Sequence, residues 1–137
     1  MNLTEMTLAR LIPAPAAEVF DVWLDPHSPG GPWFGGAGAR VILNPFVDGL
    51  FYSAVSHEGK IWAHYGRFIA IERPRRVEHT WVSEATKGLE TIVTVTFEPQ
   101  GEQTNVTLTH SGVPDDEMGC KHKDGWTFVL SALAERF

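Results

Sequence analysis

The sequence predicts an α+β fold, in which a curved antiparallel β-sheet wraps around a long C-terminal helix and a short helical segment lies near the N-terminus. Two observations carry this prediction. Residues 112–137 have the pattern of an amphipathic helix, and the residues before them form a succession of strand-like segments separated by turns. Because these segments follow one another without intervening helices, we expect neighbouring strands to be antiparallel.

The N-terminal part is predicted to contain one strand and one helix. Residues 4–12 have the composition of a strand, which Pro13 and Pro15 end. Residues 16–24 form a short helix with its apolar side chains on one side, and Asp25-Pro26 ends it, because the residue before a proline disfavours helical backbone angles. Residues 27–39 are dominated by Gly and Pro, so we expect no regular element over most of this loop.

Six further strands are predicted in the middle of the chain, at residues 40–44, 50–56, 60–72, 76–83, 89–98 and 104–111. Turn residues separate them, for example at Asp48-Gly49 and at Arg73-Pro74. Alternation is clear in the last two of these strands: Val93, Val95 and Phe97 fall on one face of the first, and Val106 and Leu108 on one face of the second. One face of the sheet is therefore expected to be buried and the other to face water.

The C-terminal helix is predicted to begin within residues 112–117, with Pro114 in its first turn and acidic residues where the helix dipole favours them. The residues on one face of this helix recur at steps of three and four: Met118, His122, Trp126, Val129, Leu130, Leu133 and Phe137. Gly125 lies within this helix, where it costs about 1 kcal/mol relative to Ala. We interpret it as a position that lets another backbone or a ligand come close.

Composition limits the functions that the chain can have. At 137 residues, with 43% hydrophobic and 20% charged residues, it is expected to be one globular domain, residues 1–137. A net charge of −6 without a basic stripe argues against nucleic acid as a partner. One cysteine allows no internal disulfide and fits a reducing compartment. Since no signal peptide or membrane span is visible, we expect a cytoplasmic protein.

Four parts of the sequence resemble a known superfamily. They are residues 9–20 (ARLIPAPAAEVF), residues 32–35 (PWFG), residues 66–74 with 79–81, and residues 90–97 with 122–126 (HKDGW). Together, and in this order, they resemble the START-like helix-grip superfamily, also called SRPBCC, and within it the heat-shock-protein-90 ATPase activator homologue-like family. Asp48-Gly49 stands where the family usually has Gly-Gly, and the loop over residues 27–39 is unusually rich in Gly and Pro.

The resemblance implies a cavity between the sheet and the C-terminal helix. A twisted sheet does not close against a helix along its whole length, and such gaps commonly hold small molecules. We interpret Trp33 and Phe34, large apolar residues in a loop, as a lid or as a contact for a partner. The predicted ligand-binding residues are Trp33, Phe34, Phe51, Trp62, His64, Phe68, His79, Trp81, His110, His122, Trp126 and Leu130.

Two of these residues, His79 and His110, are open to two interpretations. By strand parity and by the resemblance, both are expected on the concave face of the sheet among aromatic residues. There they would orient a polar group of an otherwise apolar ligand, or act as acid and base near neutral pH. The alternative is that each is a core histidine satisfied by a backbone or hydroxyl partner.

Other chemistries find little support in the sequence. The six histidines are dispersed, and none pairs with a carboxylate at helix spacing, so we expect no metal site and no cofactor. Ser111 lacks the context of a nucleophile elbow, and the glycines of residues 30–38 lack that of a phosphate loop. Cys120 lies near a helix start, which lowers a thiol pKa, but it is more simply read as an ordinary thiol. No catalytic residue is predicted.

Three functions follow from these observations. We predict binding of a small hydrophobic or amphipathic ligand in the cavity. The resemblance also implies a co-chaperone-like role with a chaperone as the partner, although the eukaryotic activators carry an additional domain. A third alternative is an enzyme of the cyclase or hydratase type that uses the cavity histidines. Monomer and homodimer are both left open by the sequence, since either Trp33-Phe34 or a sheet edge could form a dimer contact.

Overall fold

The computed structural model describes residues 1–34 and 39–137, so residues 35–38 of the predicted loop lie outside the described residues. Within the described part, the strands are β1 (Leu3–Ile12), β2 (Arg40–Leu43), β3 (Leu50–His57), β4 (Lys60–Glu72), β5 (Arg76–Ser83), β6 (Thr91–Gln100) and β7 (Gln103–Pro114). The helices are α1 (Ala16–Trp23), the short 3-10 helix η1 (Glu84–Thr86), α2 (Glu117–Cys120) and α3 (His122–Arg136).

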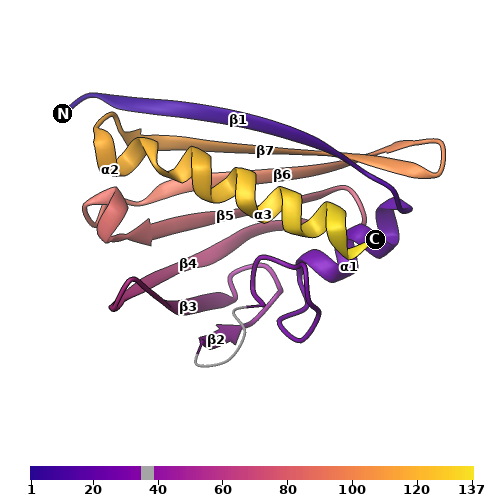
Figure 1. Cartoon of the computed structure of the whole chain (residues 1–137), viewed down its shortest axis with the longest axis horizontal. Coiled ribbons are helices and arrows are strands. Elements are labelled where there is room, and N and C mark those ends of the chain that lie inside the picture. Colours follow the sequence, from indigo (N-terminus) through magenta and orange to yellow (C-terminus); the bar gives the residue numbers. More distant parts are fainter. Residues whose placement is uncertain (35–38) are drawn as a thin grey trace.

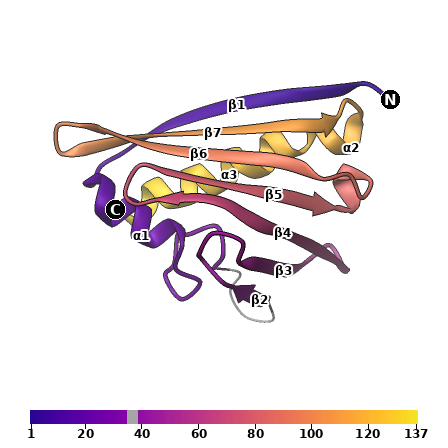
Figure 2. The same ribbon diagram turned by 180° about the vertical axis from the view of Figure 1, so that it is seen from behind.

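The described strands form one seven-stranded sheet in the order β1-β7-β6-β5-β4-β3-β2. All neighbouring strands are antiparallel. The helix α3 lies along one face of the curved sheet (Figure 1), and in the opposite view it lies behind the strands (Figure 2). This arrangement confirms the α+β, helix-grip fold predicted from the sequence. Among the described residues, no helix is both long enough and apolar enough to cross a membrane.

The buried core lies between α3, α1 and the inner face of the sheet. Val93 and Val95 of β6 are fully buried, as their alternation predicts, whereas the alternate residue Glu98 is exposed. The helix α1 covers one end of this core, where the rings of Phe20 and Phe97 meet edge to face with centroids 5.1 Å apart. Aromatic pairs of this geometry add about 1 kcal/mol beyond the burial of their area.

The start of the C-terminal helix differs from the prediction. Pro114 belongs to β7, where it pairs with Leu3 of β1, so the long-range pairing extends the strand beyond the residue at which local signals favour a helix. The helical part begins after Asp116, whose side chain caps α2 by accepting a hydrogen bond from Gly119 N at 2.7 Å. A break at Lys121 then separates α2 from α3, and His122 Nδ1–H donates to the Gly119 carbonyl at 2.8 Å.

Some smaller boundaries and positions also differ. The strand predicted to begin at Leu89 begins at Thr91, because Leu89 N closes the turn by donating to Thr86 O. Met118 and Phe137, predicted on the buried face of the helix, are 39% and 36% exposed. Both lie beyond the stretch of α3 whose residues Trp126, Leu130 and Leu133 are buried against the sheet.

Gly125 makes no close contact with another backbone. This contradicts the interpretation that the glycine lets another backbone come close. A Cβ atom built on it would meet no described atom within 4 Å. We therefore expect Gly125→Ala to raise the free energy of unfolding by about 1 kcal/mol, which is the difference in helix propensity. Urea denaturation measures this change. The matched variant Gly119→Ala should be destabilised, because its Cβ would overlap the Pro114 carbonyl oxygen; equal effects of the two variants would contradict the prediction.

Candidate ligand-binding site

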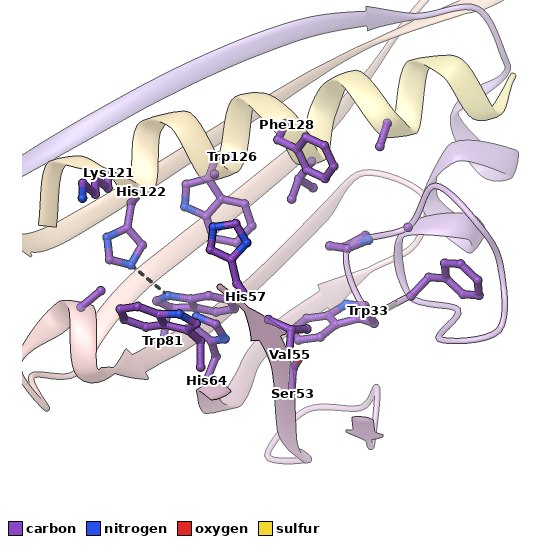
Figure 3. A pocket seen from close by; sticks show the side chains of 18 of the residues that line it. Trp33, Ser53, Val55, His57, His64, Trp81, Lys121, His122, Trp126 and Phe128 are labelled. Carbon is purple, nitrogen blue, oxygen red and sulfur yellow. Dashed lines mark hydrogen bonds between the residues drawn. The ribbon is translucent and has the colours of Figure 1, made fainter. Parts of the chain in front are cut away.

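A cavity of about 760 Å³ lies between the inner face of the sheet, α3 and the segment before β2. This volume is within the range of sites that hold small molecules. Its lining is mostly apolar, and in Figure 3 the aromatic side chains of β5, α3 and the loop surround one space. The main lining residues are Trp33, Phe34, Ser53, Val55, His57, Trp62, His64, His79, Trp81, Met118, Lys121, His122, Gly125, Trp126, Phe128 and Val129.

Three tryptophans from different elements form the aromatic wall. Trp81 of β5 packs against Trp126 of α3, with ring centroids 5.0 Å apart, and against Trp33 of the loop at 6.5 Å. Trp33 is only 3% exposed and also packs on Phe51, so it belongs to the wall of the cavity and is not a lid at the surface. Phe34, its neighbour in sequence, is 42% exposed and also lines the cavity.

His110 has both ring nitrogens hydrogen-bonded within the core. Thr91 Oγ1 donates to the Trp81 carbonyl at 2.6 Å, so it accepts from His110 Nε2–H at 2.7 Å. The other nitrogen, Nδ1, accepts from Trp126 Nε1–H at 3.0 Å. Burial lowers the pKa of His110 to about 3, and the ring is therefore neutral at physiological pH. This geometry is that of a core histidine that joins α3 to the sheet.

His79 differs from His110, because only one of its nitrogens has a protein partner. Its Nδ1–H donates to the Thr80 carbonyl at 2.8 Å, while no described residue hydrogen-bonds Nε2. The ring packs against Phe51 and Phe68, and it lines the cavity. Burial lowers the pKa of His79 to about 4. Its Nε2 is then a hydrogen-bond acceptor at neutral pH, suited to a hydroxyl or amide donor on a ligand.

His64 and His122 both contact Trp81. The ring of His64 stacks on Trp81 with centroids 4.7 Å apart. His122 Nε2 accepts from Trp81 Nε1–H at 3.4 Å, the bond drawn in Figure 3. Burial and, to a smaller extent, electrostatic repulsion from His122 lower the pKa of His64 to about 4. Burial also lowers the pKa of His122. These histidines are consequently neutral parts of the aromatic wall.

The structure brings most of the predicted site residues together. Eight of them line the cavity: Trp33, Phe34, Trp62, His64, His79, Trp81, His122 and Trp126. Phe51, Phe68, His110 and Leu130 are buried behind this wall and do not line it. Sequence reasoning missed several lining residues, notably Lys121 and Phe128, because they lie outside the apolar face of the C-terminal helix from which the site was predicted. Gly125, interpreted from the sequence as a position where a ligand could come close, does line the cavity.

Two further features concern reactive groups. Desolvation and the neighbouring Asp115 carboxylate raise the pKa of the Cys120 thiol, whose Sγ lies 3.6 Å from Asp115 Oδ1, so this thiol is not activated by the helix start. Among the described residues, no group of three or more His, Cys, Asp or Glu side chains is placed to hold a metal ion.

Comparison with known proteins agrees with the resemblance seen in the sequence. A family model described as "Activator of Hsp90 ATPase homolog 1-like protein" matches residues 13–137. Protein Mll3558 from Rhizobium loti has a similar structure, with a TM-score of 0.80 and 21% identity over 99% of this chain and 98% of that one. Protein CV1439 from Chromobacterium violaceum gives a TM-score of 0.79 and 22% identity over 96% of both chains.

A third similar structure is that of PFC0360w, described as an HSP90 activator from Plasmodium falciparum. It has a TM-score of 0.72 and 20% identity, over 90% of this chain and 88% of that one. At these identities the solved structures show a shared fold. None of the curated proteins compared with the chain matches it.

Proposed function

The chain belongs to the Activator of Hsp90 ATPase homolog 1-like family, and from this premise we propose that it binds a small hydrophobic or amphipathic molecule between the sheet and α3. The cavity of about 760 Å³ with its wall of three tryptophans carries the proposal. Burial of a ligand against Trp33, Trp81 and Trp126 would provide affinity through removal of apolar surface from water. His79 Nε2 would accept a hydrogen bond from a polar group of the ligand.

The lowered pKa of His79 and the hydrogen bonds of His110 favour ligand binding over catalysis. A general base works best when its pKa is near the working pH. The pKa of His79 is lowered to about 4, so its neutral ring is a weak base, and both nitrogens of His110 are occupied by Thr91 and Trp126. No Asp or Glu is among the described residues that line the cavity. A cyclase or hydratase mechanism would therefore need a stronger base than these residues provide.

The test of the proposal is native mass spectrometry combined with tryptophan fluorescence. Freshly purified protein is expected to carry a small molecule that is released on denaturation. Otherwise it should take up a neutral aromatic probe such as methyl 1-naphthoate, and binding of the probe should quench the tryptophan emission of the protein. Gly125→Leu should weaken uptake, because the new side chain would enter space that the ligand needs. Thr127→Leu is the matched control, since Thr127 is exposed on α3 and does not line the cavity.

Two results would overturn the proposal. One is a protein that carries no small molecule and takes up no neutral probe at any concentration in which the probe is soluble. The other is uptake that Gly125→Leu and Thr127→Leu reduce equally, because the probe would then bind elsewhere.

A co-chaperone-like role is the second candidate, and the family membership favours it together with the likeness to a structure described as an HSP90 activator. Exposed apolar side chains around β2, among them Ile42, Phe46 and Val47, offer a surface for a protein partner. A purified heat-shock-protein-90 chaperone should then bind the chain at low salt and show increased ATP hydrolysis. Absence of both effects at low salt would contradict this role.

A further inference from the structure

We propose that the preferred ligand is an aromatic acid, with its flat body against the tryptophan wall and its carboxylate at Lys121. This inference rests on the proposed function of the cavity and adds the charge of the ligand to it. It follows from the distribution of charge around the cavity, from the ion pair that the neighbouring Asp116 already makes, and from the position of Lys121 beside the aromatic residues.

Lys121 is the one Lys, Arg, Asp or Glu among the described residues that line the cavity. The histidines His64, His79 and His122 of the wall have lowered pKa values and are neutral, so they neither offset nor supplement the charge of Lys121. A bound anion would therefore meet a cation and no acid. A bound cation would meet Lys121 and no carboxylate, which disfavours it despite the aromatic surface.

The charge of Lys121 is not offset by a carboxylate of the described part of the chain, because no salt bridge forms at its Nζ. The nearby Asp116 is already engaged: its carboxylate accepts from Gly119 N at 2.7 Å and pairs with Lys87 Nζ at 2.9 Å. Lys121 therefore has no ion-pair partner among the described residues and lies near a carboxylate that is already paired, which makes it a positive group at the cavity in a chain of net charge −6.

The cation and the aromatic wall lie next to each other. Lys121 directly precedes α3, and the next residue, His122, is bonded to Trp81. In Figure 3, Lys121 and His122 lie at the start of α3, on the same stretch of helix as Trp126. The N-terminal end of α3 adds a smaller preference for negative charge. A ligand with a ring and an adjacent carboxylate would contact both features at once.

The experiment compares three probes that share a naphthalene ring and differ in charge: 1-naphthoate, its neutral methyl ester and 1-naphthylmethylammonium. Affinities come from quenching of tryptophan emission at pH 7.5, in about 20 mM and about 500 mM NaCl. We expect 1-naphthoate to bind about three- to tenfold more tightly than the ester at low salt, and the cation to bind most weakly. High salt should reduce this preference.

The matched variants are Lys121→Gln and Lys123→Gln, which remove the same charge two positions apart. Both lysines are exposed, but Lys123 does not line the cavity. Lys121→Gln should lower the affinity for 1-naphthoate about three- to tenfold and leave that for the ester unchanged. Lys123→Gln should change neither affinity by more than about twofold.

The affinities of the three probes and of the two variants test whether the ligand is an acid. Equal affinities for the three probes, or equal effects of the two variants, would overturn the proposed acid preference while leaving ligand binding intact. A higher affinity for the cation would overturn it as well. If even the neutral ester fails to bind, the proposed function fails and the inference fails with it. Thermal unfolding of both variants should match that of the unmodified protein, since exposed substitutions have small effects on stability.

Discussion

Acidification from about pH 7 to about pH 5 is expected to lower the free energy of unfolding by several kcal/mol. Burial lowers the pKa of His110 to about 3 and those of His64 and His79 to about 4, from an unfolded value of 6.5. Below about pH 6.5 the unfolded chain binds protons at these positions and the folded protein does not. Stability therefore falls as the pH falls, by roughly 2 kcal/mol per histidine at pH 5.

Urea denaturation at a series of pH values measures this effect. The slope of the free energy against pH gives the number of protons taken up on unfolding, which should approach about three near pH 5. His79→Phe should reduce this number by about one, while keeping an aromatic ring beside Phe51 and Phe68. Phe128→Ala, an exposed substitution that removes no titratable group, should leave this number unchanged. Stability independent of pH in this window would mean that the histidines are charged or solvated in the folded protein.

Trp126→Ala is expected to lower the free energy of unfolding by about 3–5 kcal/mol, as is usual for the loss of a buried tryptophan side chain. Trp126 is 6% exposed, contacts Trp81, and donates to His110 Nδ1. The substitution removes the ring and also leaves a buried acceptor without its donor. Because the same ring forms part of the cavity wall, uptake of the neutral probe should also weaken.

The conservative change Trp126→Phe separates the two contributions. It keeps much of the ring packing but removes the hydrogen bond, which should cost about 1–3 kcal/mol. Phe128→Ala is the matched control on the same helix, because Phe128 is 76% exposed and its loss should change stability by less than about 0.5 kcal/mol. Equal losses at Trp126 and Phe128 would show that Trp126 does not anchor α3 to the sheet.

Most of the sheet could be predicted from the sequence because alternation and turn residues coincide there. The predicted ranges 60–72 and 76–83 match β4 and β5, which the Arg73-Pro74 turn separates. The start of the C-terminal helix could not be predicted in the same way. The residues around Pro114 favour the start of a helix. However, Pro114 pairs with Leu3, which is distant in sequence, and this pairing places Pro114 in the strand β7. Such pairing leaves no local signal.

The sequence predicts which face of each strand and helix points toward the candidate site, but it does not predict which side chains on that face line the cavity. Strand parity correctly places His79 and Trp81 on one side of β5, and both line the cavity. Parity cannot tell a wall residue from one behind the wall, so His110, which Trp126 and Thr91 enclose, was included. The lysine at the cavity was missed because a helix pattern built on apolar periodicity passes over a charged residue at the break between α2 and α3.

The pairing of β1 with β7 determines when the fold can be completed during synthesis on the ribosome. Ile12 pairs with Thr104, and Thr104 Oγ1 donates to the Ala14 carbonyl across 90 positions of sequence. Strands β3 to β7 can each pair with the strand made just before, but β1 has no partner until β7 emerges. Its backbone N–H and C=O groups have no partner in the sheet while residues 13–102 are synthesised. The N-terminal strand is therefore the segment longest open to wrong pairing or to capture by other proteins in the nascent chain.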